Sequence, residues 1–430
     1  MLERLFNLKE NGTSVRTEVI AGITTFLTMS YIIFVNPEIL SSTGMDRNAV
    51  FVATCLAAAL GTLVMAFVAK WPIGMAPGMG LNAFFAFTVV GAMGFSWQQA
   101  LGAVFISGVI FLILTVSGIR GWLIAGIPQS MRSAIAAGIG LFLAIIALKN
   151  SGIVAASDAT FVTLGDITKT GPLLAILGFF IIAALDALKV RGAILIGILV
   201  VTVLSMLLGV SQFNGVVSAP PSLLPTFLQL DIPGALHSGL VHVILVFVLV
   251  EVFDATGTLI GVAKRAGLIQ EGKPNRLGKA LLADSTAIVA GSLLGTSSTT
   301  AYVESASGVQ AGGRTGLTAL VIALLFLAAL FFSPLAGSVP AYATAPALLY
   351  VAGLMMRELV EIKWEDVTEA APAALTALMM PFTYSIANGL AFGFISYAVL
   401  KTLTGRPGEV HPATWIVAAL FVIRFAFFVG

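Results

Sequence analysis

The chain has 430 residues, of which 58% are hydrophobic and only 10% are charged, and its mean hydropathy is +1.04. A soluble domain cannot bury so large an apolar share, so the composition indicates a polytopic membrane protein. The net charge of +2 and the lack of basic clusters interleaved with aromatic residues exclude nucleic acid as a partner. The single cysteine, Cys55, excludes an internal disulfide, and three scattered histidines argue against a metal site or an intramembrane metalloenzyme.

Residues 1–17 are charged and amphipathic and lack the short apolar run and cleavage site of a signal peptide, so we expect an uncleaved cytoplasmic N-terminus. Fourteen apolar runs follow as candidate membrane spans. They cover 18–36, 48–69, 79–94, 97–118, 131–149, 172–188, 192–210, 238–262, 277–294, 301–312, 315–333, 342–356, 370–385 and 387–403. A further apolar run, 413–429, fits either an extra span or an interfacial segment.

The arrangement of these runs predicts two related halves. Placing the N-terminus in the cytoplasm puts nearly all Lys and Arg residues on the cytoplasmic side, which supports the count and the orientation. The third and tenth runs are short and follow the breaks PIGMAPGMGLN and GTSSTTAY. Such breaks are common in membrane helices, but paired breaks seven spans apart indicate inverted repeats around a substrate site. We therefore expect an all-α protein with strand-like breaks and the following parts: repeats at 18–210 and 238–405, an external linker at 211–237 and a C-terminal segment at 406–430.

Four acids lie inside predicted spans of the second half, where each costs about 2.5 to 3.5 kcal/mol at a helix centre. They are Glu251, Asp254, Asp284 and Glu304. Structural explanations are open for each: a hydroxyl partner for Glu251, a neighbouring threonine for Asp254, a helix interface for Asp284, and the positive end of the tenth helix for Glu304. The functional interpretation is that they face a central cavity, where they bind substrate N–H groups or carry coupling protons.

The short third span begins NAFFAF, and its aromatic rings could stack on a planar heterocycle whose N–H groups meet a carboxylate. Phe84 and Phe85 fit equally well as lipid-facing or core residues. These two features together favour an amide-like ring as the substrate.

Five motifs in this order resemble the AzgA-like adenine/guanine/hypoxanthine permeases of the nucleobase:cation symporter superfamily, which have the uracil/xanthine permease fold. The motifs are GITTFLTMSYIIFVNP (22–37), PGMGLNAFFAF (77–87), AGIGLFLAIIALKNSGI (137–153), VFDATGTLIG (252–261) and TAYVESASGVQAGGRTGLTA (300–319). The resemblance covers nearly the whole chain. It implies fourteen membrane segments in two inverted repeats of seven, with a core domain that moves against a gate domain.

The resemblance also implies roles for individual residues. Asp254 and Glu304 match the substrate-binding acids, and Asp284 matches a supporting or proton-linked acid, so these three and Glu251 are the candidates for proton coupling. Thr25 stands where the xanthine and uracil branch has a histidine. The remaining expected substrate contacts are Asn82, Ala83 and Phe84 in the third span and Val303 and Ser305 beside Glu304.

We therefore expect a proton-coupled importer of hypoxanthine, guanine or adenine in a bacterial inner membrane. No catalytic residue, metal or cofactor is expected, and a proton is favoured over sodium as the coupling ion. The expected partners are a purine nucleobase and the lipid bilayer, with a homodimer left open. The alternative is a transporter of the same fold for uracil, xanthine or an inorganic anion. Thr258 stands where xanthine carriers have an acid, and Glu304 stands where anion carriers have a basic residue.

Overall fold

The structure is a computed structural model that describes residues 2–237, 240–269 and 276–427. The side chains of residues 237, 253, 254 and 427 also lie outside the described part. One predicted site residue, Asp254, is therefore placed only by its backbone, which lies within a long helix.

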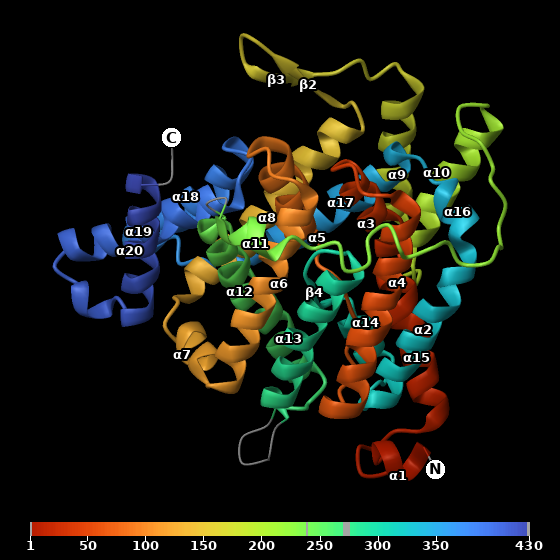
Figure 1. Ribbon diagram of the computed structural model, residues 1–430, viewed down its shortest axis with the longest axis horizontal. Coiled ribbons are helices and arrows are strands. Elements are labelled where there is room, and N and C mark those ends of the chain that lie inside the picture. Colours follow the sequence, from red (N-terminus) through yellow and green to blue (C-terminus); the bar gives the residue numbers. More distant parts are fainter. Residues whose placement is uncertain (1, 238–239, 270–275, 428–430) are drawn as a thin grey trace.

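The described chain is a bundle of apolar helices (Figure 1). Ten helical segments of at least 18 residues are apolar enough to cross a membrane, and four shorter apolar helices accompany them. The long segments are α2 with α3 (Val15–Met29, Ile32–Ser41), α4 with the π-helix η1 (Arg47–Val64, Met65–Ala69), α6 (Trp97–Val116), α8 (Gln129–Asn150), α9 (Thr170–Ala187), α12 (Val241–Arg265), α13 (Leu277–Leu294), α15 with η3 and α16 (Gly316–Ala329, Leu330–Phe332, Ser333–Gly337), α17 with η4 (Ala341–Met355, Met356–Glu361) and α19 (Ile386–Leu403).

The shorter apolar helices are α5 with the π-helix η2 (Met79–Ala83, Phe84–Ala92), α10 (Ala193–Leu207), α18 (Val367–Phe382) and α20 (Pro412–Phe427). Five small helices complete the described chain: α1 (Leu2–Phe6), α7 (Ile119–Ala125), α11 (Ile232–His237), α14 (Ser305–Gln310) and η5 (Pro407–Glu409). The chain is thus a helical polytopic membrane protein, as its composition predicts.

Two short antiparallel strand pairs interrupt this helical pattern. β1 (Met75–Pro77) pairs with β4 (Thr299–Ala301), with Ala76 opposite Thr300. β2 (Val154–Ser157) and β3 (Phe161–Leu164) form a hairpin that projects from one end of the molecule (Figure 1). The hairpin was not predicted, because its residues lie between two apolar runs and carry no hydropathy signal of their own.

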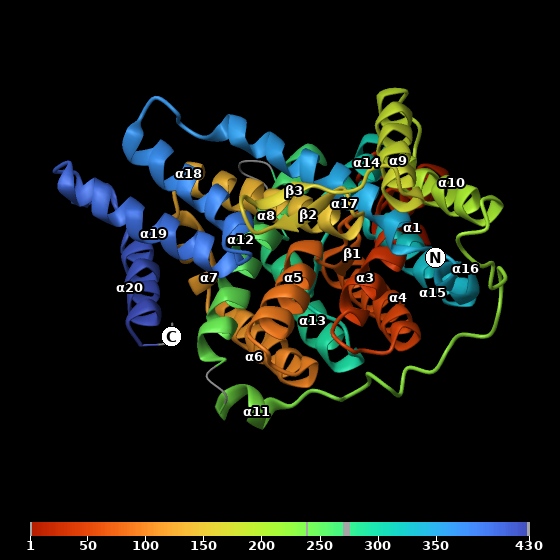
Figure 2. The same ribbon diagram turned by 90° about the horizontal axis from the view of Figure 1, so that it is seen from above.

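The helices pack in two sets. In one set α8 packs against α17 and α18, α17 against α9, and α9 against α10, whereas in the other α13 packs against α4 and α6, and α15 packs against α2 and α4. The segment between α10 and α11 runs along the outside of the molecule (Figure 2). Backbone hydrogen bonds tie it to the second set, including Leu228 N–H to the Leu293 carbonyl at 2.9 Å.

The first span departs from the expected single helix over 18–36. It consists of α2 and α3, which are separated at Ser30 and Tyr31. Near the start of α2, the buried Glu18 carboxylate accepts backbone N–H bonds from Arg314 (2.9 Å) and from Thr315 and Thr318 at the start of α15. Glu18 therefore serves as a distant N-terminal cap for α15, because it accepts hydrogen bonds from backbone amides at and just before the start of that helix.

Candidate functional site

The candidate site lies where β1 and β4 pair in the protein interior, a place that we call the strand crossing. All six strand residues are buried, α5 follows β1, and α14 follows β4. Because the strands are antiparallel, the two short helices leave the strand pair in opposite directions, and both helices begin near it. Interrupted helices that begin at a shared central point are typical of substrate sites in membrane transporters.

Side chains satisfy the irregular backbone at this crossing, as the apolar surroundings require. The Thr62 hydroxyl accepts from Met75 N–H at 2.9 Å, and the Ser305 hydroxyl accepts from Gly74 N–H at 3.0 Å. The Tyr302 hydroxyl donates to the Pro77 carbonyl at 2.6 Å. Ser305, predicted as a substrate contact, is thus fully buried and bonded to the first-half break.

Asn82 lies in a buried hydrogen-bond network that joins four segments. Its amide donates to Asn36 at 2.6 Å, and its carbonyl oxygen accepts from the Ser297 hydroxyl. Asn36 in turn donates to Thr54 at 2.7 Å and to Thr296 at 2.9 Å. All five side chains are inaccessible to solvent, so the network holds α3, α4 and α5 against the segment that precedes β4.

Asp284 forms a buried ion pair with Arg120. The Arg120 guanidinium donates to one Asp284 oxygen at 3.2 Å, and the other oxygen accepts from the Thr300 hydroxyl at 2.9 Å and from Ala301 N–H at 3.2 Å. Arg120 also donates to the Thr256 hydroxyl at 3.0 Å. Sequence reasoning missed this partner, because hydropathy assigns Arg120 to a cytoplasmic loop, whereas α7 carries its side chain into the bundle.

Glu251 is buried beside this ion pair but is bonded much more weakly. Its Oε1 accepts from the Ser107 hydroxyl at 3.3 Å, and its Oε2 has no hydrogen-bond partner within the described residues. The Ser298 hydroxyl, Asp284 and Arg120 also interact with this carboxylate. The structure therefore brings two of the four predicted acids together with one cation.

Glu304 sits at the start of α14, half-buried, next to Val303, whose side chain is 57% exposed. The Tyr31 hydroxyl, which sequence reasoning did not select, donates to Glu304 Oε1 at 2.5 Å. Thr25 is fully buried, and its hydroxyl has no hydrogen-bond partner in the described part of the chain. The first span thus does face Glu304, but through Tyr31, six residues after Thr25.

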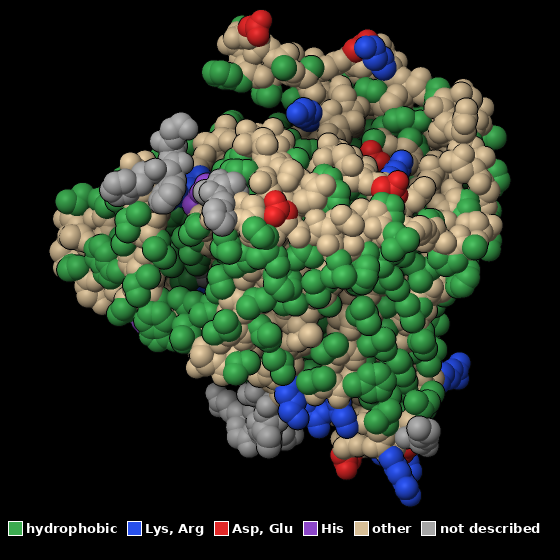
Figure 3. Space-filling view, in the orientation of Figure 1, with side chains coloured by type: hydrophobic (Ala, Val, Ile, Leu, Met, Phe, Trp, Pro, Cys, Tyr) green, Lys and Arg blue, Asp and Glu red, His purple; other side chains and the backbone are tan. Residues whose placement is uncertain are grey.

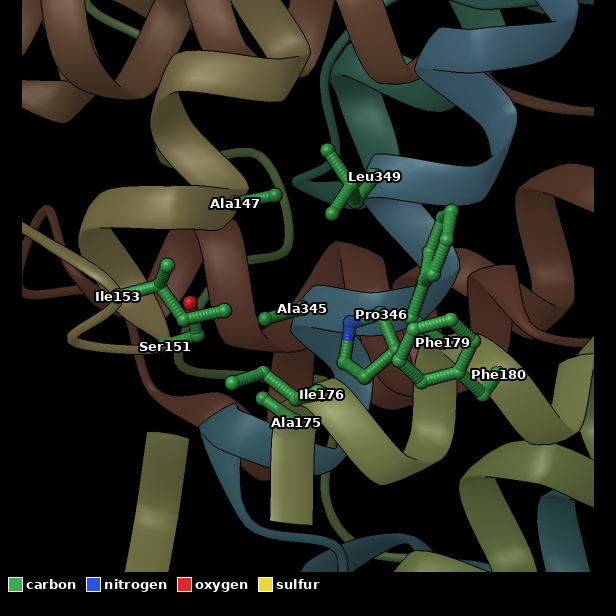
Figure 4. A pocket seen from close by; sticks show the side chains of 10 residues that line it. All are labelled: Ala147, Ser151, Ile153, Ala175, Ile176, Phe179, Phe180, Ala345, Pro346 and Leu349. Carbon is green, nitrogen blue, oxygen red and sulfur yellow. The ribbon is translucent and has the colours of Figure 1, made fainter. Parts of the chain in front are cut away.

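The predicted aromatic contact is also enclosed by protein. Ala83 and Phe84 have no exposed surface, and the Phe84 ring meets Phe247 of α12 edge-on at a centroid distance of 5.2 Å. An apolar pocket lies elsewhere, between α8, α9 and α17, and includes Phe179 and Pro346 (Figure 4). None of the predicted site residues lines that pocket.

Paired helix breaks, buried acids and an apolar helical exterior define the chain as a membrane transporter. Residues 16–392 match the model of the Permease family, Xan_ur_permease, and the chain belongs to this family. The family resemblance seen in the motifs is therefore confirmed, and the protein is a transporter and not an enzyme.

Individual relatives cover almost the whole chain. The adenine permease AdeP of Escherichia coli (strain K12) is 53% identical over 99% of this chain and 96% of its own length. The guanine/hypoxanthine permease PbuO of Bacillus subtilis (strain 168) is 46% identical over 98% of this chain and 99% of its own length.

Solved structures show the fold. The transmembrane domain of the cyanobacterial bicarbonate transporter BicA matches with a TM-score of 0.62 and 15% identity, covering 95% of this chain and 96% of that one. The structure of SLC26A9 matches with a TM-score of 0.65 and 10% identity, covering 94% of this chain and 68% of that one.

Proposed function

We propose that this chain imports purine nucleobases (hypoxanthine, guanine or adenine) by proton-coupled alternating access. The observation that carries the proposal is the identity of 46% to 53% with guanine/hypoxanthine and adenine permeases over nearly the full length. Glu304 at the strand crossing supports it, because a carboxylate at this place can accept the N–H groups of a purine ring. Asp254, Phe84 and Val303 complete the proposed contact set.

Proton coupling is proposed for the buried acids, without sodium or any cofactor. Among the described acids, Glu251 has suitable surroundings, because its hydrogen-bond partner is a hydroxyl and it can exchange a proton without losing a direct ion pair. Asp284 cannot do so, since protonation would break its contact with Arg120. Uptake into proteoliposomes driven by a pH gradient, with and without a protonophore, tests this coupling.

The architecture proposed with this function has fourteen membrane segments in inverted repeats at 18–210 and 238–405, joined by the linker 211–237. The set around α4, α13 and α15 is the proposed core, and the set around α8, α17 and α18 is the proposed gate. Hydrophobic side chains form a broad band across the molecule, and basic side chains gather beyond it near α1 and the start of α13 (Figure 3). This distribution supports a cytoplasmic N-terminus at residues 1–17 in the bacterial inner membrane. The same proposal includes a homodimer, and it places residues 406–430 at the membrane as an interfacial segment or an extra span.

The substitution Glu304→Gln tests the function directly. It removes the charge but keeps the shape, so we expect uptake of radiolabelled hypoxanthine to fall by at least about tenfold while the protein still reaches the membrane. The matched control is Glu365→Gln, at an exposed glutamate outside the apolar helices, which should leave uptake unchanged. Normal uptake by the Glu304 variant would contradict the assignment.

A further inference from the structure

We propose that Tyr31 is the positioning residue for the Glu304 carboxylate and thereby sets the affinity of the transporter for its substrate. The inference rests on the proposed function, in which Glu304 accepts N–H groups of a purine. The hydroxyl of the buried Tyr31 donates to the Glu304 carboxylate, so its part is to act through that group and not to bind the ring itself.

The geometry of the contact is that of a strong hydrogen bond. Tyr31 Oη lies 2.5 Å from Glu304 Oε1, within the range of charge-assisted hydroxyl–carboxylate bonds. Tyr31 lies between the C-terminus of α2 and the first residue of α3, and its ring belongs to the main hydrophobic core. A rigid side chain with two rotatable bonds, packed on all sides, holds its hydroxyl in one place.

A whole face of the first span supports this contact. Thr25, Thr28 and Tyr31 are spaced three residues apart, so they lie along one side of the helical path. The residues that they meet, in the same order, are Gly308, Ser307 and Glu304. Thr28 and Ser307 hydroxyls are 2.9 Å apart, and the Ser307 hydroxyl also donates to the Glu304 backbone carbonyl at 2.7 Å. The backbone and the carboxylate of Glu304 are therefore both fixed from the first span.

Fixing the carboxylate before substrate arrives lowers the entropy lost on binding. Without the Tyr31 hydroxyl, Oε1 loses this hydrogen bond, so the carboxylate is held less tightly before substrate binds. We expect this loss to weaken substrate binding about three- to tenfold while the conformational cycle continues at its normal rate.

The substitution Tyr31→Phe tests this role, because it deletes only the hydroxyl. The KM for hypoxanthine uptake should rise about three- to tenfold, with the maximal rate per transporter within about twofold of wild type. The matched control is Tyr350→Phe. Tyr350 also donates to a carboxylate, Asp186 Oδ2 at 2.6 Å, but neither residue belongs to the candidate site, so its KM should not change.

The outcomes separate the inference from the function on which it rests. Wild-type protein that takes up no purine overturns the proposed function. Wild-type uptake together with an unchanged KM for the Tyr31 variant overturns the inference alone. A lower yield of the variant leaves the test intact, because KM does not depend on the amount of transporter. Radiolabelled purine binding to detergent-purified variant gives the second measurement and should show the same loss of affinity.

Discussion

Arg120 and Asp284 show how a charged residue becomes acceptable inside a membrane bundle. The two oxygens of the Asp284 carboxylate accept three hydrogen bonds, one from the Arg120 guanidinium and two from the β4 segment. The guanidinium in turn lies over the Phe111 ring, 4.0 Å from its centroid. Each partner therefore makes the burial of the other tolerable, and neither can be removed alone without leaving an isolated charge.

The substitution Arg120→Met tests this mutual dependence. It leaves Asp284 as a buried carboxylate near Glu251, so we expect a loss of roughly 3 to 5 kcal/mol of stability and a clearly lower unfolding temperature. Fluorescence-detected thermal unfolding of purified protein provides the measurement. Adding Asp284→Asn should recover part of the loss, and Arg276→Met, at an exposed arginine, should have no effect. An unchanged unfolding temperature for Arg120→Met would show that the ion pair is not needed.

At the scale of elements, α14 and α2 pack closely enough that only glycine fits at one position. A Cβ added at Gly308 would lie 2.7 Å from the Ala21 carbonyl oxygen and still closer to the Thr25 hydroxyl. The hydrogen bonds of Thr28 and Tyr31 to α14 and its first turn prevent the two elements from moving apart. The close approach thus follows from the same contacts that position Glu304.

We therefore expect Gly308→Ala to lower stability by about 1 to 3 kcal/mol, because α14 has to shift away from α2. The shift should also reduce hypoxanthine uptake. Gly353→Ala in α17 is the matched control, since nothing lies within 4 Å of the added Cβ, and it should be neutral or slightly stabilising. The measurements are the unfolding temperature and the hypoxanthine uptake of both variants. Equal values for the Gly308 and Gly353 variants would mean that α14 and α2 are not in tight contact at Gly308.

The N-terminus of α18 makes a pH-dependent contribution to the stability of the fold. Asp366 caps α18 by accepting from Thr368 N–H at 2.9 Å, and both of its oxygens accept from Arg406 at 3.2 Å. Arg406, followed by Thr368, holds the pKa of the Asp366 carboxyl well below its usual range. A carboxyl with a lowered folded-state pKa stabilises the fold above its ordinary value and loses this effect as the pH falls.

The expected result is a pH-dependent difference between wild type and Asp366→Asn. At pH 7 the variant should unfold at a lower temperature, and the difference should shrink progressively below about pH 4, the ordinary range of an aspartate. Thermal unfolding in detergent from pH 7 to pH 3 measures it. A difference that stays constant over this range would contradict a role for the ionised carboxylate.

At the scale of the whole molecule, hydropathy located most spans because lipid imposes a long apolar run on every complete crossing. Gly, Pro and hydroxyl residues interrupt those runs where the structure has β1 and β4. Hydropathy could not place α14 as a helix of only six residues, nor divide the first span at Ser30 and Tyr31. These boundaries depend on tertiary contacts that no local pattern records.

Prediction of the candidate site from sequence has the same limit, because contacts between distant segments leave no local pattern. The acids could be selected from sequence, because each is costly in a membrane and so requires a reason. Their partners could not, since Arg120 is 164 positions away from Asp284 and Tyr31 is 273 positions away from Glu304. The sequence predicts Asn82 and Ser305 as substrate contacts, whereas in the structure their side-chain polar atoms bind other protein groups.

The β1–β4 pair has a consequence for biogenesis. β1 belongs to the first half of the chain and β4 to the second, so the ribosome completes β1 long before its partner exists. Until then, the open backbone around residues 75–77 has to be hydrated or shielded by the insertion machinery, because lipid offers it no hydrogen bonds. The two halves therefore cannot complete their folding one after the other as independent units, because β1 is paired only after β4 has been synthesised.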